Sequence, residues 1–135
     1  MELKLDSRIE NIDLLTERVN KELVRLGCAR KIMAQIDIAL DELFSNVSHY
    51  AYGGSVGAFY FRLESSEDNS SITMTLEDEG VPFDPLAHED PDIKQELAER
   101  AIGGLGIFLV KKTMDAIDYA HKNGRNVLTI TKKIK

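Results

Sequence analysis

Apolar side chains recur every three or four residues along two long stretches in the first half of the chain. The first stretch follows Asp6 and Ser7, either of which could cap a helix, and ends at Gly27; the second runs from about Ala29 to Ala51. This spacing places the apolar side chains on one side of a helix, where they are expected to face a core. Two consecutive amphipathic helices are therefore predicted. Their stripes contain Ile12, Leu15, Val19, Leu23 and Leu26, and then Ile32, Ile36, Leu40, Leu43 and Val47.

Apolar and polar residues alternate in segments before and after these helices. Such alternation is typical of strands that bury one face and expose the other. Asn123-Gly124 is a strong signal for a tight turn between the last two segments. The predicted strands are Glu2 to Asp6, Val56 to Leu63, Ile72 to Leu76, Ile117 to Tyr119 and Asn126 to Ile134.

The stretch from Leu86 to about Gly104 differs from the rest of the chain, because its composition is that of a loop with one short helical piece near residues 93–100. Long irregular segments in small domains are usually functional. Directly after it, Gly103-Gly104-Leu105-Gly106 is expected to begin a further helix that continues to about Asp115.

Length and composition limit the classes to which the protein can belong. Its 135 residues are expected to form one domain, 1–135, and a hydrophobic fraction of 43% is that of a folded chain. The net charge of −6 argues against a nucleic-acid binder. The longest apolar run is too short to span a bilayer, and no signal-peptide pattern is visible. We therefore expect a cytoplasmic protein without a membrane partner. The single cysteine, Cys28, excludes an internal disulfide.

Polar residues with chemical potential lie beside the apolar stripe of the second helix. Glu42 and Asn46 are four residues apart and should sit one turn from each other. Glu42 could accept a proton, and Asn46 could offer a neutral oxygen to a hard cation. The alternative is an ordinary amphipathic helix with polar flanks.

Two glycine-containing motifs follow. Asp78-x-Gly80 ends a predicted strand, so its carboxylate could accept from an exocyclic amine while the glycine lets a flat ring approach; an acidic turn is the alternative. Gly103-Gly104-x-Gly106 could present backbone N–H groups at a helix start to phosphates. It is neither a Walker A loop nor a dinucleotide fingerprint, and a glycine-rich hinge is the alternative.

The order of these motifs resembles the GHKL superfamily of ATP-binding domains, and most closely the bacterial anti-sigma factor serine/threonine-protein kinases. The resemblance covers essentially the whole chain. It implies the Bergerat fold, an α/β two-layer sandwich (α+β) with a mixed, mostly antiparallel sheet and helices on one face. The segments that carry it are Asp41-Glu-Leu-Phe-Ser-Asn-Val47, Asp78-Glu-Gly-Val-Pro-Phe-Asp-Pro85 and Gly103-Gly-Leu-Gly-Ile-Phe-Leu-Val-Lys-Lys112.

By this resemblance, ATP and Mg2+ are the expected cofactors. Asn46 would bind the Mg2+ held by the phosphates, and Glu42 would be the general base that activates the attacking hydroxyl. Asp78 would accept from the adenine amino group, with Gly80 beside the ring.

The resemblance also assigns the segment after the third strand. The segment of about residues 84–104 would form a lid over ATP. Gly104 and Gly106 would give backbone donors to the phosphates, and Arg100 is the nearest candidate for a contact to the terminal phosphate.

The chain departs from the superfamily pattern in two places. Pro82 stands where a second glycine is common, which removes a donor and stiffens the turn. Arg125 follows the glycine that opens the last strand, where a threonine usually helps to hold adenine through water. His49, one turn past Asn46, either touches the nucleotide region or is a surface histidine.

The resemblance implies a kinase that phosphorylates a STAS-domain anti-anti-sigma partner and otherwise sequesters a sigma factor. The charged face of the first helix, with Arg18, is the expected docking face, and a homodimer is possible. The alternatives are a nucleotide-dependent binding module of the same fold without kinase activity, an ATPase with water as acceptor, and a structural domain without a ligand.

Overall fold

The computed structural model describes residues 1–87 and 104–135 of the chain. The side chains of residues 104 and 105 are not among the described parts. The short helical piece expected near residues 93–100 therefore lies outside the described residues.

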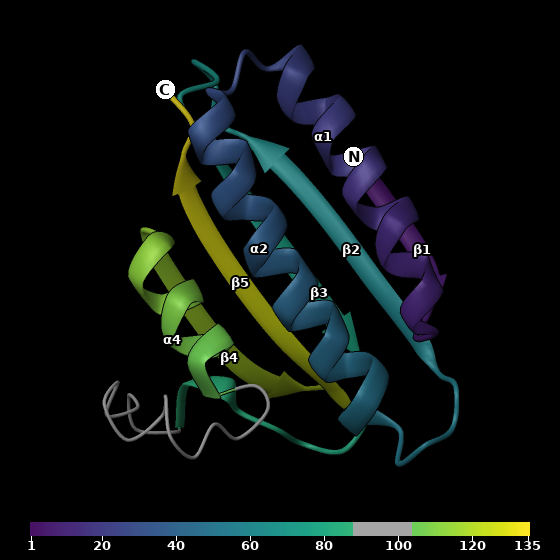
Figure 1. Ribbon diagram of the computed structural model, residues 1–135. Helices are drawn as coiled ribbons and strands as arrows, with labels where there is room; N and C mark the ends of the chain where they lie inside the picture. The colour runs from purple at the N-terminus through teal and green to yellow at the C-terminus, as the bar shows by residue number, and fades with distance from the viewer. Residues whose placement is uncertain (88–103) are drawn as a thin grey trace.

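The described strands form one five-stranded sheet with the order β1-β2-β3-β5-β4. All four pairings are antiparallel, so this sheet is antiparallel rather than mixed. β5 leaves the β4 hairpin at Asn123-Gly124 and inserts beside β3, as Figure 1 shows. The strands are β1 (Glu2–Asp6), β2 (Ala58–Ser65), β3 (Ser71–Asp78), β4 (Ala116–Lys122) and β5 (Arg125–Lys133).

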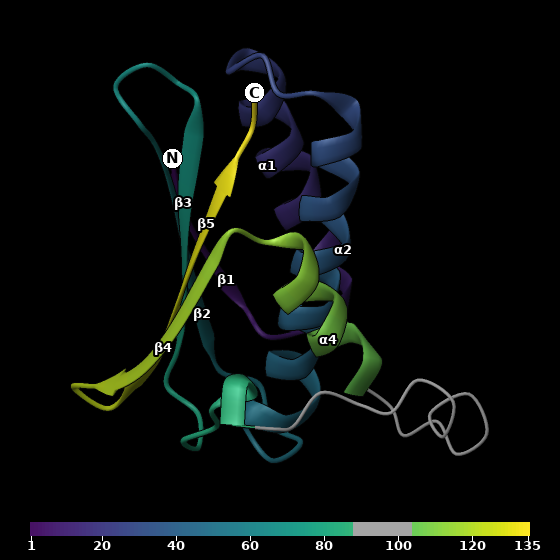
Figure 2. The same ribbon diagram turned by 90° about the vertical axis from the view of Figure 1, so that its left-hand side faces the viewer.

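The described helices cover one face of this sheet, and the other face carries no helix of the described residues (Figure 2). The two predicted amphipathic helices are α1 (Ile12–Arg25), entered through a 3-10 turn at Ile9–Asn11, and α2 (Arg30–Asn46); the glycine segment begins α4 (Gly104–Thr113). This arrangement confirms the predicted two-layer sandwich. None of these helices is long and apolar enough to cross a membrane.

The core lies between the two layers and consists of the residues that the hydrophobic pattern selected. Leu15, Val19 and Leu23 of α1 are fully buried. From α2, Phe44 meets Phe59 of β2 edge to face, with 4.9 Å between the ring centroids. Burial of one such ring contributes about 2–3 kcal/mol, so this contact fixes α2 firmly on the sheet.

The second predicted helix is not regular to its end. α2 stops at Asn46, and the chain continues as a π-helical turn over Val47–Ala51. In this wider turn, the His49 Nδ1 atom lies 2.8 Å from the Ser45 carbonyl oxygen, to which it donates. Single π turns inside helices often mark functional sites, and this one begins directly after Asn46.

Candidate functional site

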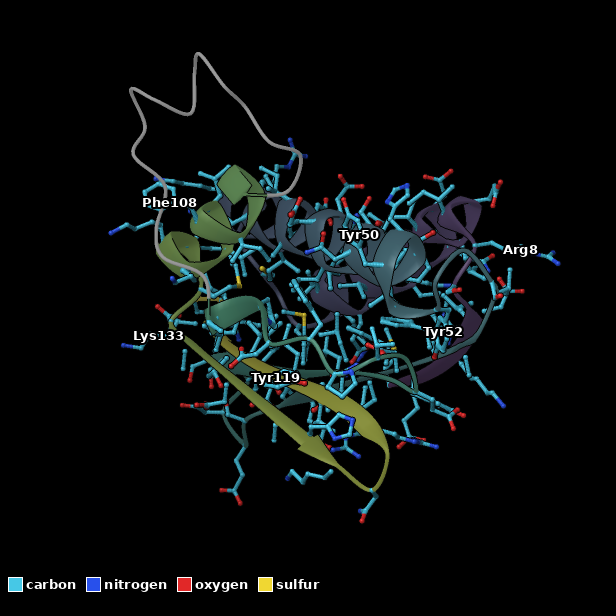
Figure 3. The ribbon with its side chains drawn as sticks, turned by 90° about the horizontal axis from the view of Figure 1, so that it is seen from below. Arg8, Tyr50, Tyr52, Phe108, Tyr119 and Lys133 are labelled. Atoms are coloured by element: carbon cyan, nitrogen blue, oxygen red, sulfur yellow. The ribbon has the colours of Figure 1, made fainter. Side chains whose placement is uncertain are left out.

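A cavity lies where the end of α2 and the π turn meet the ends of β3, β4 and β5. Figure 3 views the molecule from this end, with Tyr50 on the helical layer and Tyr119 on the sheet. The space measures about 50 Å3, and two of its lining residues, Tyr50 and Phe83, are exposed to solvent. The lining residues are Leu43, Asn46, Val47, Tyr50, Ala51, Leu76, Asp78, Val81, Phe83, Pro85, Tyr119, Asn126 and Leu128.

Asp78, the last residue of β3, supplies a carboxylate to this otherwise largely apolar cavity. Its side chain is 8% exposed. The Gly80 backbone N–H donates to Asp78 Oδ1 at 3.0 Å, and the Asn126 amide donates to the same atom at 2.8 Å. Since both bonds go to Oδ1, Oδ2 keeps its capacity to accept a hydrogen bond from a ligand.

Position 80 requires glycine for a structural reason that the sequence motif alone did not reveal. A Cβ atom at this position would lie 2.2 Å from the Ala51 carbonyl oxygen. The same oxygen accepts from the Val81 N–H at 2.9 Å. Only glycine therefore lets the end of β3 approach the backbone of the π turn closely enough to close this side of the cavity.

The last strand contributes a polar side chain to the cavity, Asn126, which was not among the predicted site residues. The resemblance had drawn attention to Arg125, which stands where a threonine is usual. Arg125 lies on the outer face of the sheet, with its guanidinium 4.0 Å from the Tyr60 ring centroid and 3.8 Å from Glu77. Successive residues of a strand point to opposite faces, so Arg125 cannot reach the cavity while Asn126 does.

Asn126 connects four groups around the cavity. Besides Asp78, its amide nitrogen donates to the Val81 carbonyl at 2.9 Å. Its oxygen accepts from the Phe83 N–H at 3.1 Å and from the Tyr119 hydroxyl. Burial raises the pKa of the Tyr119 phenol, which keeps this donor protonated.

Glu42 and Asn46 occupy successive turns of α2, as predicted, but their surroundings differ. Asn46 lines the cavity, whereas Glu42 lies against α4. Burial raises the pKa of the Glu42 carboxyl; the neighbouring Asn46 amide opposes this, and the negative charge of Asp41 adds to it. The Oε1 atom of Glu42 is buried and has no hydrogen-bond partner among the described residues. It is thus an acceptor that a substrate hydroxyl could satisfy.

Gly106 provides the space for the Glu42 carboxyl group. A Cβ atom at Gly106 would lie 2.1 Å from Glu42 Cδ and 2.2 Å from its Oε2. α4 begins at Gly104, as predicted, and the first N–H groups of a helix have no partner within it. The first turn of α4 therefore brings backbone donors that have no partner within the helix close to the carboxylate of Glu42.

The other predicted site residues either lie outside the described part of the chain or are exposed on the surface. Arg100 and most of the predicted lid over 84–104 lie outside the described residues. His49 is exposed, and Arg18 is exposed on α1. No group of three or more His, Cys, Asp or Glu that could hold a metal occurs among residues 1–87 and 104–135. A cation at Asn46 would therefore need further oxygen ligands from a bound molecule, as a triphosphate provides.

Known proteins resemble this chain over most of its length. Residues 5–132 match the histidine kinase-like ATPase domain. The chain is 27% identical over 139 residues to the serine-protein kinase RsbW of Bacillus mycoides (strain KBAB4), which covers 100% of this chain and 85% of the relative. It is 28% identical over 97 residues to the serine/threonine-protein kinase BtrW of Bordetella bronchiseptica, covering 71% of this chain and 67% of that one.

A solved structure has a similar fold. The crystal structure of the RsbU and RsbW domains of a Mycobacterium tuberculosis protein superposes with a TM-score of 0.63 over 99% of this chain and 32% of that chain. The sequence identity is 16%, so this likeness concerns the fold alone.

Proposed function

Because the chain belongs to the histidine kinase-like ATPase domain family, we propose that it binds ATP with Mg2+ and transfers the γ-phosphate to a serine or threonine of a small partner protein. The proposal rests on the arrangement of these side chains. Asp78 and Asn46 line the same cavity. Glu42 lies one turn before Asn46 on α2, next to Gly106 of α4.

The residues fit the parts of a nucleotide. Oδ2 of Asp78 would accept from the adenine amino group, with the ring beside Gly80. The carboxamide oxygen of Asn46 suits a hard cation such as Mg2+. The backbone N–H groups at Gly104 and Gly106, at the positive end of α4, suit phosphate oxygens.

Glu42 would orient the acceptor hydroxyl and take its proton. Its buried Oε1 has no other donor among the described residues, and its raised pKa brings its basicity closer to that needed at neutral pH. When bound, Mg2+ would offset the charge that develops on the transferred group. Most of the rate enhancement in phosphoryl transfer comes from such positioning and electrostatics.

The relatives named serine-protein kinases support a protein as the acceptor. We expect a STAS-domain anti-anti-sigma protein, with a sigma factor as the second partner that the unengaged kinase sequesters in the cytoplasm. The exposed charged face of α1, including Arg18, is the expected docking surface, and a homodimer fits the same scheme.

The decisive experiment is incubation with γ-labelled ATP and a candidate STAS-domain protein. Label on a serine or threonine of the partner, absent with Glu42→Gln, is the expected result. Nucleotide binding without transfer to any partner would instead favour a binding module, and ADP release without a partner would favour an ATPase.

A further inference from the structure

We propose that Asn126 is a positioning residue that aims the Asp78 carboxylate at the base and so sets the preference for adenine. The inference rests on the proposed function and deepens the account of the same cavity. Asn126 lies on β5 directly opposite Asp78 of β3 in the strand register. Its side chain is 7% exposed, so it is held among protein groups rather than by solvent.

The orientation of the Asn126 amide is determined by its partners. The nitrogen faces the Asp78 carboxylate at 2.8 Å and the Val81 carbonyl at 2.9 Å, both of which can only accept. The oxygen faces the Phe83 backbone N–H at 3.1 Å, which can only donate, and the Tyr119 hydroxyl. A flipped amide would place donor against donor and acceptor against acceptor.

These four bonds use the two donors and two acceptor sites of the amide. Asn126 therefore has no hydrogen-bonding group left for a base, and it acts on a ligand through Asp78. The same bonds attach Val81 and Phe83, which line the cavity, to the sheet. One side chain thus fixes both the recognition group and one wall of the base site.

The consequence for Asp78 is a fixed assignment of its two oxygens. Asn126 and the Gly80 N–H both occupy Oδ1, which leaves Oδ2 for the exocyclic amine of adenine. Hypoxanthine carries a carbonyl oxygen at that place and would set acceptor against acceptor. Without Asn126, only the Gly80 N–H would restrain the carboxylate, which could then rotate and lose this distinction.

The test compares the dissociation constants of ADP and IDP, measured by calorimetry on the wild-type protein and on Asn126→Leu. This change keeps a side chain of similar size but removes the amide that donates to Asp78. We expect the wild type to prefer ADP by about 100-fold and the variant to lose at least about tenfold of that preference. Asn20→Leu is the matched control, because it removes an amide that donates to another carboxylate, Asp37, at 3.4 Å, away from the cavity, and its preference should stay within about twofold of wild type.

Each result is decisive. A folded Asn126→Leu variant that keeps the full preference, or that weakens ADP and IDP equally, overturns the inference in favour of a merely structural role. If circular dichroism shows that Asn126→Leu does not fold, the same ratio in Asn126→Ser decides, since its shorter side chain cannot reach Asp78. A wild-type protein that binds neither nucleotide would refute the proposed function itself, and the inference with it.

Discussion

At one end of the cavity, every hydrogen-bonding group of Asn126 is paired, and Asp78 receives two donors on one oxygen. Outside the cavity, one turn from Asn46 and against α4, the buried Oε1 of Glu42 has no partner among the described residues. We call the first group, Asp78, Asn126 and Tyr119, the base end, and the second, Glu42, Asn46 and Gly106, the transfer end. The base end is organised in advance for recognition, whereas the transfer end keeps an unpaired acceptor in place.

This difference indicates what each end contributes. Paired groups at the base end stabilise the fold and fix ligand geometry together, so changes there affect binding and stability alike. A buried carboxylate oxygen without a donor, such as Oε1 of Glu42, costs free energy of folding. Active sites often retain such groups because catalysis needs them. Changes at the transfer end should therefore reduce the rate of transfer while leaving, or even improving, stability.

The largest effect is expected from Glu42→Gln, which preserves shape but removes the base. Transfer to the partner should fall by about 100-fold to 10,000-fold, while the dissociation constant for ADP changes little. Quench-flow or single-turnover labelling measures the rate. Asp41→Asn is the matched control, because it removes the adjacent, exposed carboxylate and should leave the rate at neutral pH unchanged. Equal losses in both variants would contradict the role of Glu42.

A smaller loss of rate is expected from Gly106→Ala. The added methyl group would displace the flexible Glu42 side chain, which lies 2.1 Å from the new atom, but would keep the backbone N–H. Transfer should fall by about 10-fold to 100-fold, with nucleotide affinity within about twofold of wild type. Stability should not fall, because alanine favours a helix over glycine. A rate that remains at the wild-type value would show that Glu42 need not occupy this place.

The comparison also predicts a gain in stability. Glu42→Gln removes a carboxylate whose ionisation burial disfavours, so at neutral pH it should increase the free energy of unfolding, by less than about 1 kcal/mol because the group is half-exposed and screened by solvent. The sign follows from the raised pKa of Glu42: its protonated form contributes stability at low pH that is lost as pH rises through the raised pKa. The gain measured by calorimetry should therefore shrink in acid. A destabilised variant would count against an unpaired carboxylate.

The smallest effect concerns the pH dependence of transfer. Because burial raises the pKa of Glu42, the rate should begin to fall, as pH is lowered, at a higher pH than an ordinary glutamate would give. Asp41 contributes to this rise, so Asp41→Asn should move the acid limb to slightly lower pH. Pre-steady-state rates over a pH series measure the shift; a movement to higher pH would disagree with the account.

The elements that hold Glu42, Asn46 and Asp78 could be predicted from the sequence, because each residue belongs to a local pattern. The core stripes of α1 and α2 and the alternation in β3 decide where these side chains point. The π turn after Asn46 could not be predicted, since its apolar spacing is that of an ordinary helix.

Asn126 was missed because its role depends on a hydrogen bond to Asp78, which lies 48 residues earlier in the sequence. The usable signal was the alternation of the strand: positions 126, 128 and 130 lie on one face, and Leu128 and Ile130 are apolar and buried, so Asn126 belongs to the face that meets the core. A shift of one residue, to Arg125, reverses the face. The role of Arg100 stays a prediction.

The claim that the cavity is an adenine site is tested most directly by titrating ADP with Mg2+ into wild-type protein and Asp78→Asn. The variant is isosteric and keeps an oxygen for the Gly80 and Asn126 donors, but it turns an N–H towards the amine of the base. Glu79→Gln changes the next carboxylate, which accepts from Tyr60, and serves as control. We predict saturable binding by wild type and Glu79→Gln, and affinity weaker by about 100-fold or more in Asp78→Asn. Equal affinity in all three proteins would contradict the account.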